Sequence, residues 1–484
     1  MMKKMFFGKP EETGFADSVS HYVMAAAILV FLYMAFPDLV WVYYEQCLMI
    51  PCLMLLGIQM VRRPSSEIRK TFLLPGAMVI WFLFLQGKRF MEHADLDNIG
   101  LFLTTYLFAF PLASLLQDGD KKRALKIFAG ACVAAAAMLS VGGLLLIADC
   151  LPGFLEEHIF WDGGRLTVFW HPNVGACYLM MGIVFCTAFL TQEKSWQSKT
   201  LLSVLLVLMI GIQALTGCGI VIILTGGYLS SFLFFGAIRR GRKWFVPGIF
   251  AVLILTAAFH EGAMYLDQIN TGALIKKYSE QYAQQITQAA SEGEEWTFDA
   301  EQTLPIAVDP DTGEVYLTAQ SSQGSASEEF GTWDSRTYVW SAAKFAIRET
   351  PSILYWGMHN PGDYISYYNF FPVSHLYNAW WECLVGLGVV GFLIAMIFTL
   401  ITVWNSLMVL LRHHRDIWKR STAILALCLM AAAVLEPYLF YTTPDYHLVD
   451  FLFFLCSGYL FHWQEADNRC IMSKIRGIFL SAKT

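Results

Sequence analysis

The sequence predicts an all-α integral membrane protein with about twelve transmembrane helices. Apolar residues make up 56% of the 484 residues, charged residues make up 15%, and the mean hydropathy is +0.49. Soluble domains are less apolar and more highly charged. Runs of about 17 to 28 residues without a charge cluster recur along the chain, and each can cross roughly 30 Å of hydrocarbon as a helix. The runs lack the alternation of barrel strands.

The apolar runs give the bounds of the expected spans. These spans cover residues 19–36, 40–61, 71–87, 98–116, 125–148, 169–191, 200–216, 219–238, 244–260, 384–411, 421–441 and 447–463. The first run lacks a small-residue cleavage site and leads directly into further runs, so we expect a retained helix and not a signal peptide.

Lysine and arginine are concentrated in alternate loops between these spans. When the spans alternate, about 25 of the 33 Lys and Arg residues fall on one side of the membrane. Loops of this kind stay in the cytoplasm, so we expect both termini to be cytoplasmic. We therefore expect a multi-pass protein of the cytoplasmic membrane, with the loops that are poor in lysine and arginine on its extracytoplasmic side.

The span pattern divides the chain into regions. We expect a region of about nine spans over 1–260, an extracytoplasmic loop region over 261–374, a region of about three spans over 375–463 and a cytoplasmic tail over 464–484. The extracytoplasmic region carries about sixteen acidic residues against about five Lys and Arg, or roughly −11. This charge argues against a nucleic-acid partner and makes each outer arginine a candidate for a local anion site.

Local patterns predict elements around this outer region. Residues 264–292 favour a helix, and 306–317 favour a hairpin around an Asp-Pro-Asp-Thr-Gly turn. Apolar residues recur at helical spacing within 335–350, which predicts an amphipathic helix near the membrane surface. Residues 379–411 are too many for one crossing, so a short interfacial helix is expected before the tenth span.

The sequence has no pattern for a metal, a nucleotide or a disulfide framework. Most of its 11 cysteines lie inside predicted spans, and CxxC, His-x-x-x-His and Walker patterns are missing. We therefore expect neither a metal site nor a cofactor.

Three clusters of polar residues and glycines lie on the predicted outer side. The first runs from Gly163-Gly164-Arg165 to His171-Pro172-Asn173 at the entrance of the sixth span. The second contains Ser335-Arg336 and Trp340, followed by Pro351, Gly357 and His359. The third contains His375-Leu376-Tyr377-Asn378, followed by Gly388 and Gly391.

In this order and on this side, the clusters resemble the bacterial O-antigen ligase and Wzy-type polysaccharide polymerase superfamily. The resemblance covers residues of about 160–395. It implies a fold like that of the C-type glycosyltransferases. It also implies metal-independent transfer of a glycan, with inversion, from a polyprenyl (undecaprenyl) diphosphate carrier to a glycan or glycolipid acceptor beside the lipid bilayer.

Arg165 and Arg336 are the expected ligands of the diphosphate. An arginine fork binds phosphate oxygens in pairs with fixed geometry, and two such cations can neutralise the charge of a departing diphosphate. By the resemblance, both are catalytic together with His375, which would act as general base or bind the diphosphate. The family commonly has His-Asn where this chain has Tyr377-Asn378, so either His375 or Tyr377 takes the role of the family's histidine.

Further residues of the same clusters are candidates for substrate binding. These are His171, Asn173, Trp340, Arg348, Tyr377 and Asn378. The two asparagines could instead cap or orient helices, and Arg348 could lie on a solvated helix face. Among the intramembrane acids Glu45, Glu436 and Asp450, Glu436 is an alternative base because it lies near the outer interface.

Two other functions fit parts of the sequence. About twelve spans would suit a lipid-linked oligosaccharide flippase or another transporter. Such a protein would not need the long outer region, nor the sequence patterns around Arg165 and Arg336. A metal-dependent C-type glycosyltransferase would need acidic residues in its first outer loop, where the sequence offers Asp38.

Overall fold

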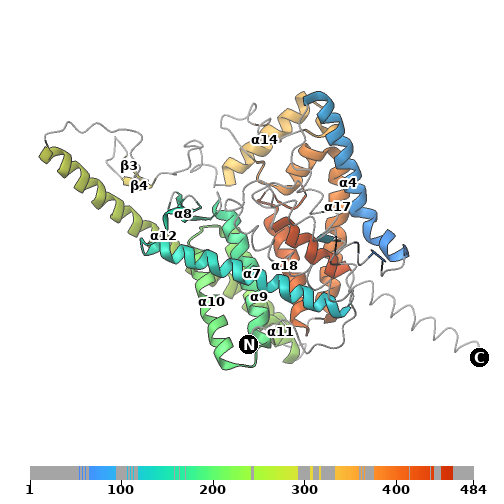
Figure 1. Ribbon diagram of the computed structural model, residues 1–484, viewed down its shortest axis with the longest axis horizontal. Coiled ribbons are helices and arrows are strands. Elements are labelled where there is room, and N and C mark those ends of the chain that lie inside the picture. Colours follow the sequence, from blue (N-terminus) through green and yellow to red (C-terminus); the bar gives the residue numbers. More distant parts are fainter. Residues whose placement is uncertain are drawn as a thin grey trace, which may run out of the picture. The chain divides into compact units, whose positions relative to one another are not determined.

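The computed structural model describes the helices and hairpins coloured in Figure 1. The described residues are 65–93, 118–156, 158–162, 164–168, 171–240, 245–292, 306–308, 315–317, 333–358, 375–413, 415–436, 438–440 and 449–461, with isolated residues in 54–61, 106–113 and 361–365. The predicted spans 19–36, 40–61 and 98–116 lie wholly or mostly outside them, as do the intramembrane candidate Glu45 and the outer-side candidate His359. The total of about twelve spans therefore stays a prediction.

Within these residues, 6 helices are long and apolar enough to cross a membrane. They cover Ile68–Lys88, Leu125–Ile147, Pro172–Gln192, Trp196–Ala214, Phe245–Leu274 and Ala379–His413. Two shorter apolar helices, Gly219–Phe232 and Val449–Phe461, accompany them. Helices pair their own backbone N–H and C=O groups, as the hydrocarbon core requires. The described residues thus form an α-helical membrane protein, as the composition predicts.

The chain divides into two compact units. The first, which we call the core unit, combines Met1–Ala136, Met181–Leu206 and Tyr338–Thr484. The second, which we call the hairpin unit, combines Ala137–Met180 and Val207–Thr337.

The hairpin unit contains two β-hairpins among its helices. Strand β1 (Ile159–Asp162) pairs antiparallel with β2 (Arg165–Val168), just after the short helix α8 (Gly153–Glu156). Strand β3 (Ile306–Val308) pairs antiparallel with β4 (Val315–Leu317), which confirms the hairpin predicted over 306–317. The sequence patterns above do not predict the first hairpin, although it carries Arg165.

Helix α12 (Phe245–Glu292) is continuous, whereas the sequence predicts a span over 244–260 and a separate helix over 264–292. The helix passes through Gly262, which lies between the two predicted segments. No close packing requires a glycine there, because a Cβ would meet no atom within 4 Å. No proline follows Pro247 in this helix, so nothing interrupts its hydrogen bonds. At 1.5 Å per residue its 48 residues extend about 72 Å, more than twice the hydrocarbon thickness, so α12 continues well outside the bilayer.

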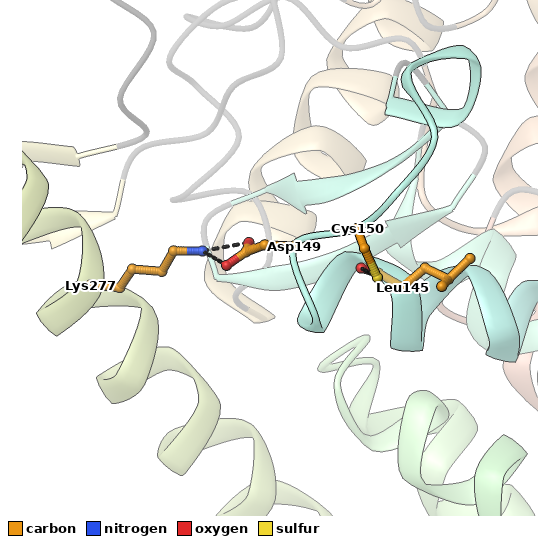
Figure 2. A network of polar contacts seen from close by, with 4 residues as sticks. All are labelled: Leu145, Asp149, Cys150 and Lys277. Carbon is orange, nitrogen blue, oxygen red and sulfur yellow. Dashed lines mark hydrogen bonds and ion pairs between the residues drawn. The ribbon is translucent and has the colours of Figure 1, made fainter.

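The C-terminal end of α7 (Asp118–Ile147) is fixed to α12 by an ion pair (Figure 2). Asp149 has a left-handed φ of 53°, and Cys150 N–H donates to Leu145 O at 2.9 Å, which is a Schellman-type helix end. Lys277 of α12 donates to both carboxylate oxygens of Asp149, at 2.5 and 2.6 Å. One of the cations predicted to lie on the outer side is thus engaged with an acid of its own unit.

The centre of the core unit lies around the helix Val449–Phe461, whose residues 449–460 are buried. The ring of Phe454 lies 4.5 Å from Tyr106 and 4.9 Å from Phe398 of α17 (Ala379–His413). Tyr106 Oη donates to Phe440 O at 3.0 Å, so a polar group is satisfied within this aromatic cluster.

Helix α17 is kinked at Gly388, where φ is 67° and ψ is −177°. The kink separates a short first segment, which carries Trp380 and Trp381, from the long apolar segment, as the length of 379–411 predicts. The turn after α15 (Ile353–Trp356) packs into the kink, and Met358 N–H donates to Val385 O at 2.7 Å. The backbones meet here without intervening side chains, because glycine occupies both positions that face each other, Gly357 and Gly388.

Helix α18 (Ile417–Ala432) ends before residue 441, the predicted end of this span. Asp416 caps its first turn by accepting the N–H groups of Trp418 and Lys419, at 3.0 and 3.4 Å. Turns follow from residue 433, ahead of Glu436-Pro437. A residue that precedes proline is disfavoured in the α conformation, so the helix does not reach residue 441.

Candidate active site

Arg165 is the first residue of β2, directly after the turn residue Gly164. Gly164 has a φ of 80°, which glycine adopts at little cost, and the turn pairs the backbones of Asp162 and Arg165. Leu166 N–H donates to Leu215 O at 2.7 Å. The hairpin is thereby tied to the connection between α10 (Trp196–Ala214) and α11 (Gly219–Arg240), which holds the Arg165 backbone in place.

The Arg165 side chain is held by two hydrogen bonds of its own. Its Nε donates to Thr216 O at 2.9 Å, and its Nη2 donates to Asn173 Oδ1 at 2.9 Å. Gly217 lies against the same side chain with a φ of 60°, and a Cβ at this position would come within 3.0 Å of the Arg165 Nε. The guanidinium plane is therefore set by groups from two parts of the hairpin unit, the α10–α11 connection and the start of α9.

The predicted neighbours Asn173 and His171 lie at the start of α9 (Pro172–Gln192). Asn173 is 4% exposed, and its backbone N–H donates to His171 Nδ1 at 3.2 Å. Asn173 therefore orients Arg165, and His171 holds the helix start. The first N–H groups of a helix carry partial positive charge, which adds to that of the guanidinium.

The arrangement leaves capacity for a ligand. A guanidinium has five N–H donors. Among the residues that the structure describes, Thr216 and Asn173 accept two hydrogen bonds from Arg165, so about three donors remain for a ligand. Asp267 of α12 interacts electrostatically with Arg165 and offsets part of its charge. Its buried Oδ1 accepts no hydrogen bond within the described ranges.

A second cluster lies in the core unit, at the start of α17. His375 Nδ1 lies 3.9 Å from Glu382 Oε1, and the same oxygen accepts Leu376 N–H at 2.5 Å. Trp340 of α14 (Trp333–Glu349) donates from Nε1 to Leu376 O at 2.8 Å. Leu376 is thus held through both of its backbone polar groups, which fixes the neighbouring His375.

Asn378 caps α17 in this cluster. Its Oδ1 accepts the N–H groups of Trp380 and Trp381 at 2.9 and 3.0 Å, and its Nδ2 donates to Val434 O at 2.7 Å. The capping role left open by the sequence is the one the structure has. Tyr377 precedes it with a left-handed φ of 49°.

Helix α14 confirms the amphipathic helix predicted over 335–350. Its buried face contains Val339, Ala343 and Ala346. Arg336 is half-buried in the first turn, one turn before Trp340 and so on the same face. Arg348 is exposed in the last turn, as a solvated face would place it.

The predicted site residues thus form two groups. Arg165, His171 and Asn173 come together in the hairpin unit, whereas Trp340, His375, Tyr377 and Asn378 come together in the core unit. A joint site of Arg165 and Arg336 stays a prediction.

No known protein family, curated protein or solved structure matches this chain. Its candidate roles therefore depend on its own geometry and sequence patterns.

Two contributors to these groups are missing from the predicted site. Thr216 lies 51 residues from Arg165 in the sequence, and its part is a backbone oxygen, which no side-chain pattern reveals. Glu382 could have been found, because it is the one charged residue in the apolar run 379–411. Of the alternative acids, Glu436 and Asp450 are both buried, and Asp450 Oδ1 accepts Leu439 N–H at 2.7 Å.

Proposed function

We propose that this protein is a glycosyltransferase of the O-antigen ligase or polymerase type. It transfers a glycan from a polyprenyl diphosphate carrier to a hydroxyl of an acceptor sugar or glycolipid, on the outer face of the cytoplasmic membrane. The observation that carries the proposal is the Arg165 guanidinium, fixed by Thr216 and Asn173 at the start of α9.

A fixed guanidinium suits a diphosphate leaving group. Charge builds up on the diphosphate oxygens as the bond to the anomeric carbon breaks, and donors that are already oriented stabilise this charge without reorganising. Arg165 supplies such donors beside a helix start. Arg336 supplies the second cation of the proposal, on the face of α14 that also carries Trp340.

His375 is the proposed general base. The acceptor oxygen attacks the anomeric carbon, the bond to the diphosphate oxygen breaks with its electron pair on the leaving group, and the acceptor proton passes to the imidazole. Attack opposite the leaving group inverts the anomeric centre. An imidazole with a nearby carboxylate is suited to this proton transfer.

Genetic complementation tests the proposal. The gene is deleted in its host, and plasmids return the wild type, Arg165→Ala, Arg336→Ala or Lys277→Ala. Surface glycan and lipid-linked intermediates are then resolved on gels. We expect each of the first two variants to lose the product, whereas Lys277→Ala, which removes an outer cation engaged with Asp149, retains it.

Immunoblots of membranes show whether each variant accumulates. Unchanged glycan in the deletion strain, or full product from both arginine variants, would refute the proposal. The lipid-linked material that accumulates identifies the reaction further. Single repeat units on the carrier indicate a lost polymerase, and full-length chains on the carrier indicate a lost ligase.

A further inference from the structure

Glu382 is a buried carboxyl group outside the set of predicted site residues. It lies in the first turn of α17 and is 1% exposed. Its Oε1 accepts Leu376 N–H at 2.5 Å and lies 3.9 Å from His375 Nδ1. A carboxyl group buried in an apolar helix is costly, so it is by default a candidate for a functional residue.

The surroundings fix this carboxyl group relative to the imidazole. Glu382 N–H donates to Asn378 O at 2.9 Å within the capped first turn of α17, where the helix dipole favours a negative charge. The segment that carries His375 is fixed at Leu376, whose N–H is bound by Glu382 and whose C=O is bound by Trp340. Both partners of the pair are thus attached to the same hydrogen-bonded frame.

The separation indicates what the pair can do. At 3.9 Å the contact is too long for a hydrogen bond but within the range of an ion pair. Catalytic hydrogen bonds are often long in ligand-free structures and shorten when the substrate binds. Because Nδ1 faces Glu382, the other ring nitrogen, Nε2, lies at the opposite edge of the imidazole.

We infer that Glu382 is a positioning residue for His375. It orients the ring through Nδ1 and stabilises the imidazolium that forms when Nε2 takes the acceptor proton. The proton stays on the imidazole until the diphosphate has left and then passes to water. This inference rests on the proposed function, since it assigns a partner to the base of that reaction.

A purely structural role is the alternative, and one substitution separates the two. Glu382→Gln retains an Oε1 that accepts Leu376 N–H but has no acidic group that can ionise beside the imidazole. Glu382→Asp retains an acidic group on a shorter side chain. Glu193→Gln is a control, because Glu193 is a half-buried acid outside both groups of candidate site residues that also accepts backbone N–H groups, those of Lys194 and Ser195.

The test measures transfer by purified full-length protein. The donor is the lipid-linked glycan extracted from the deletion strain, and the acceptor is the membrane lipid fraction of the same strain. We expect Glu382→Gln to lower kcat about 10- to 100-fold with little change in the KM for donor, and Glu382→Asp to recover part of the loss. In a His375→Gln background, Glu382→Gln should cause no further loss.

Three results would overturn the inference. One is wild-type kcat in Glu382→Gln, and another is a loss of equal size with and without His375. The third is failure of both Glu382 variants to accumulate as folded protein, which would make the role structural. These outcomes leave the Arg165→Ala result untouched, so the inference can fail while the proposed function stands; no transfer by the wild type would instead reject the function.

Discussion

At the scale of single residues, the most informative feature is how Arg165 is held. Two of its donors are bound by Thr216 O and Asn173 Oδ1, and Gly217 leaves room for the side chain. A lysine at this position would offer a point charge on a flexible stem and could not bind both partners in the same plane. Position 165 thus requires the planar guanidinium with its several N–H donors, and a positive charge alone would not replace it.

At the same scale, the contacts favour His375 over Tyr377 for the proposed role of base. The Glu382 carboxyl group lies 3.9 Å from His375 Nδ1, an arrangement that suits a general base. Tyr377 has a left-handed backbone, which serves the turn into the Asn378 cap. We therefore assign the proposed role of base to His375.

At the scale of elements, the kink of α17 depends on two glycines. Alanine at position 388 would need a φ of 67° and would place Cβ 2.7 Å from Tyr355 O. Backbone strain of this kind costs on the order of 1–3 kcal/mol. The glycine pattern that resembles the family motif therefore has a packing reason in this chain.

We expect Gly388→Ala to lower the thermal unfolding midpoint of the purified protein by several degrees, as followed by intrinsic fluorescence in detergent. Gly262→Ala in α12 is the matched control, since its Cβ would meet nothing within 4 Å and alanine favours helices. An equal midpoint for Gly388→Ala and wild type would contradict the packing account.

At the scale of the whole molecule, the orientation in the membrane can be tested with a native cysteine. Cys150 is exposed after α7, whereas the other cysteines that the structure describes are buried. By the positive-inside rule we expect it on the outer face, on the same side as the Arg165 hairpin. A membrane-impermeant maleimide should label wild-type spheroplasts, and Cys150→Ser should abolish this label. Labelling of Cys150 only after permeabilisation would reverse the orientation.

The sequence predicts the fold better than it predicts the contacts of the site. Composition and apolar runs predict the helices, because burial in lipid imposes a length and a polarity on each of them. They predict two separate segments, 244–260 and 264–292, where the structure has the single helix α12. The change from apolar to polar residues marks where the chain leaves the bilayer, but it does not show whether the helix continues there. Spacing brings Arg165 near Asn173, but the contact with Thr216 depends on tertiary packing.

Binding of the diphosphate lipid to purified protein tests the central claim most directly. Native mass spectrometry would follow titration with undecaprenyl diphosphate, with undecaprenyl monophosphate as the comparison lipid. Because the fork binds paired phosphate oxygens, we expect tighter binding of the diphosphate. Arg165→Ala should weaken it about tenfold or more, Arg165→Lys should recover little of the loss, and Lys277→Ala should match the wild type. Equal affinity of wild type and Arg165→Ala for the diphosphate would contradict the account.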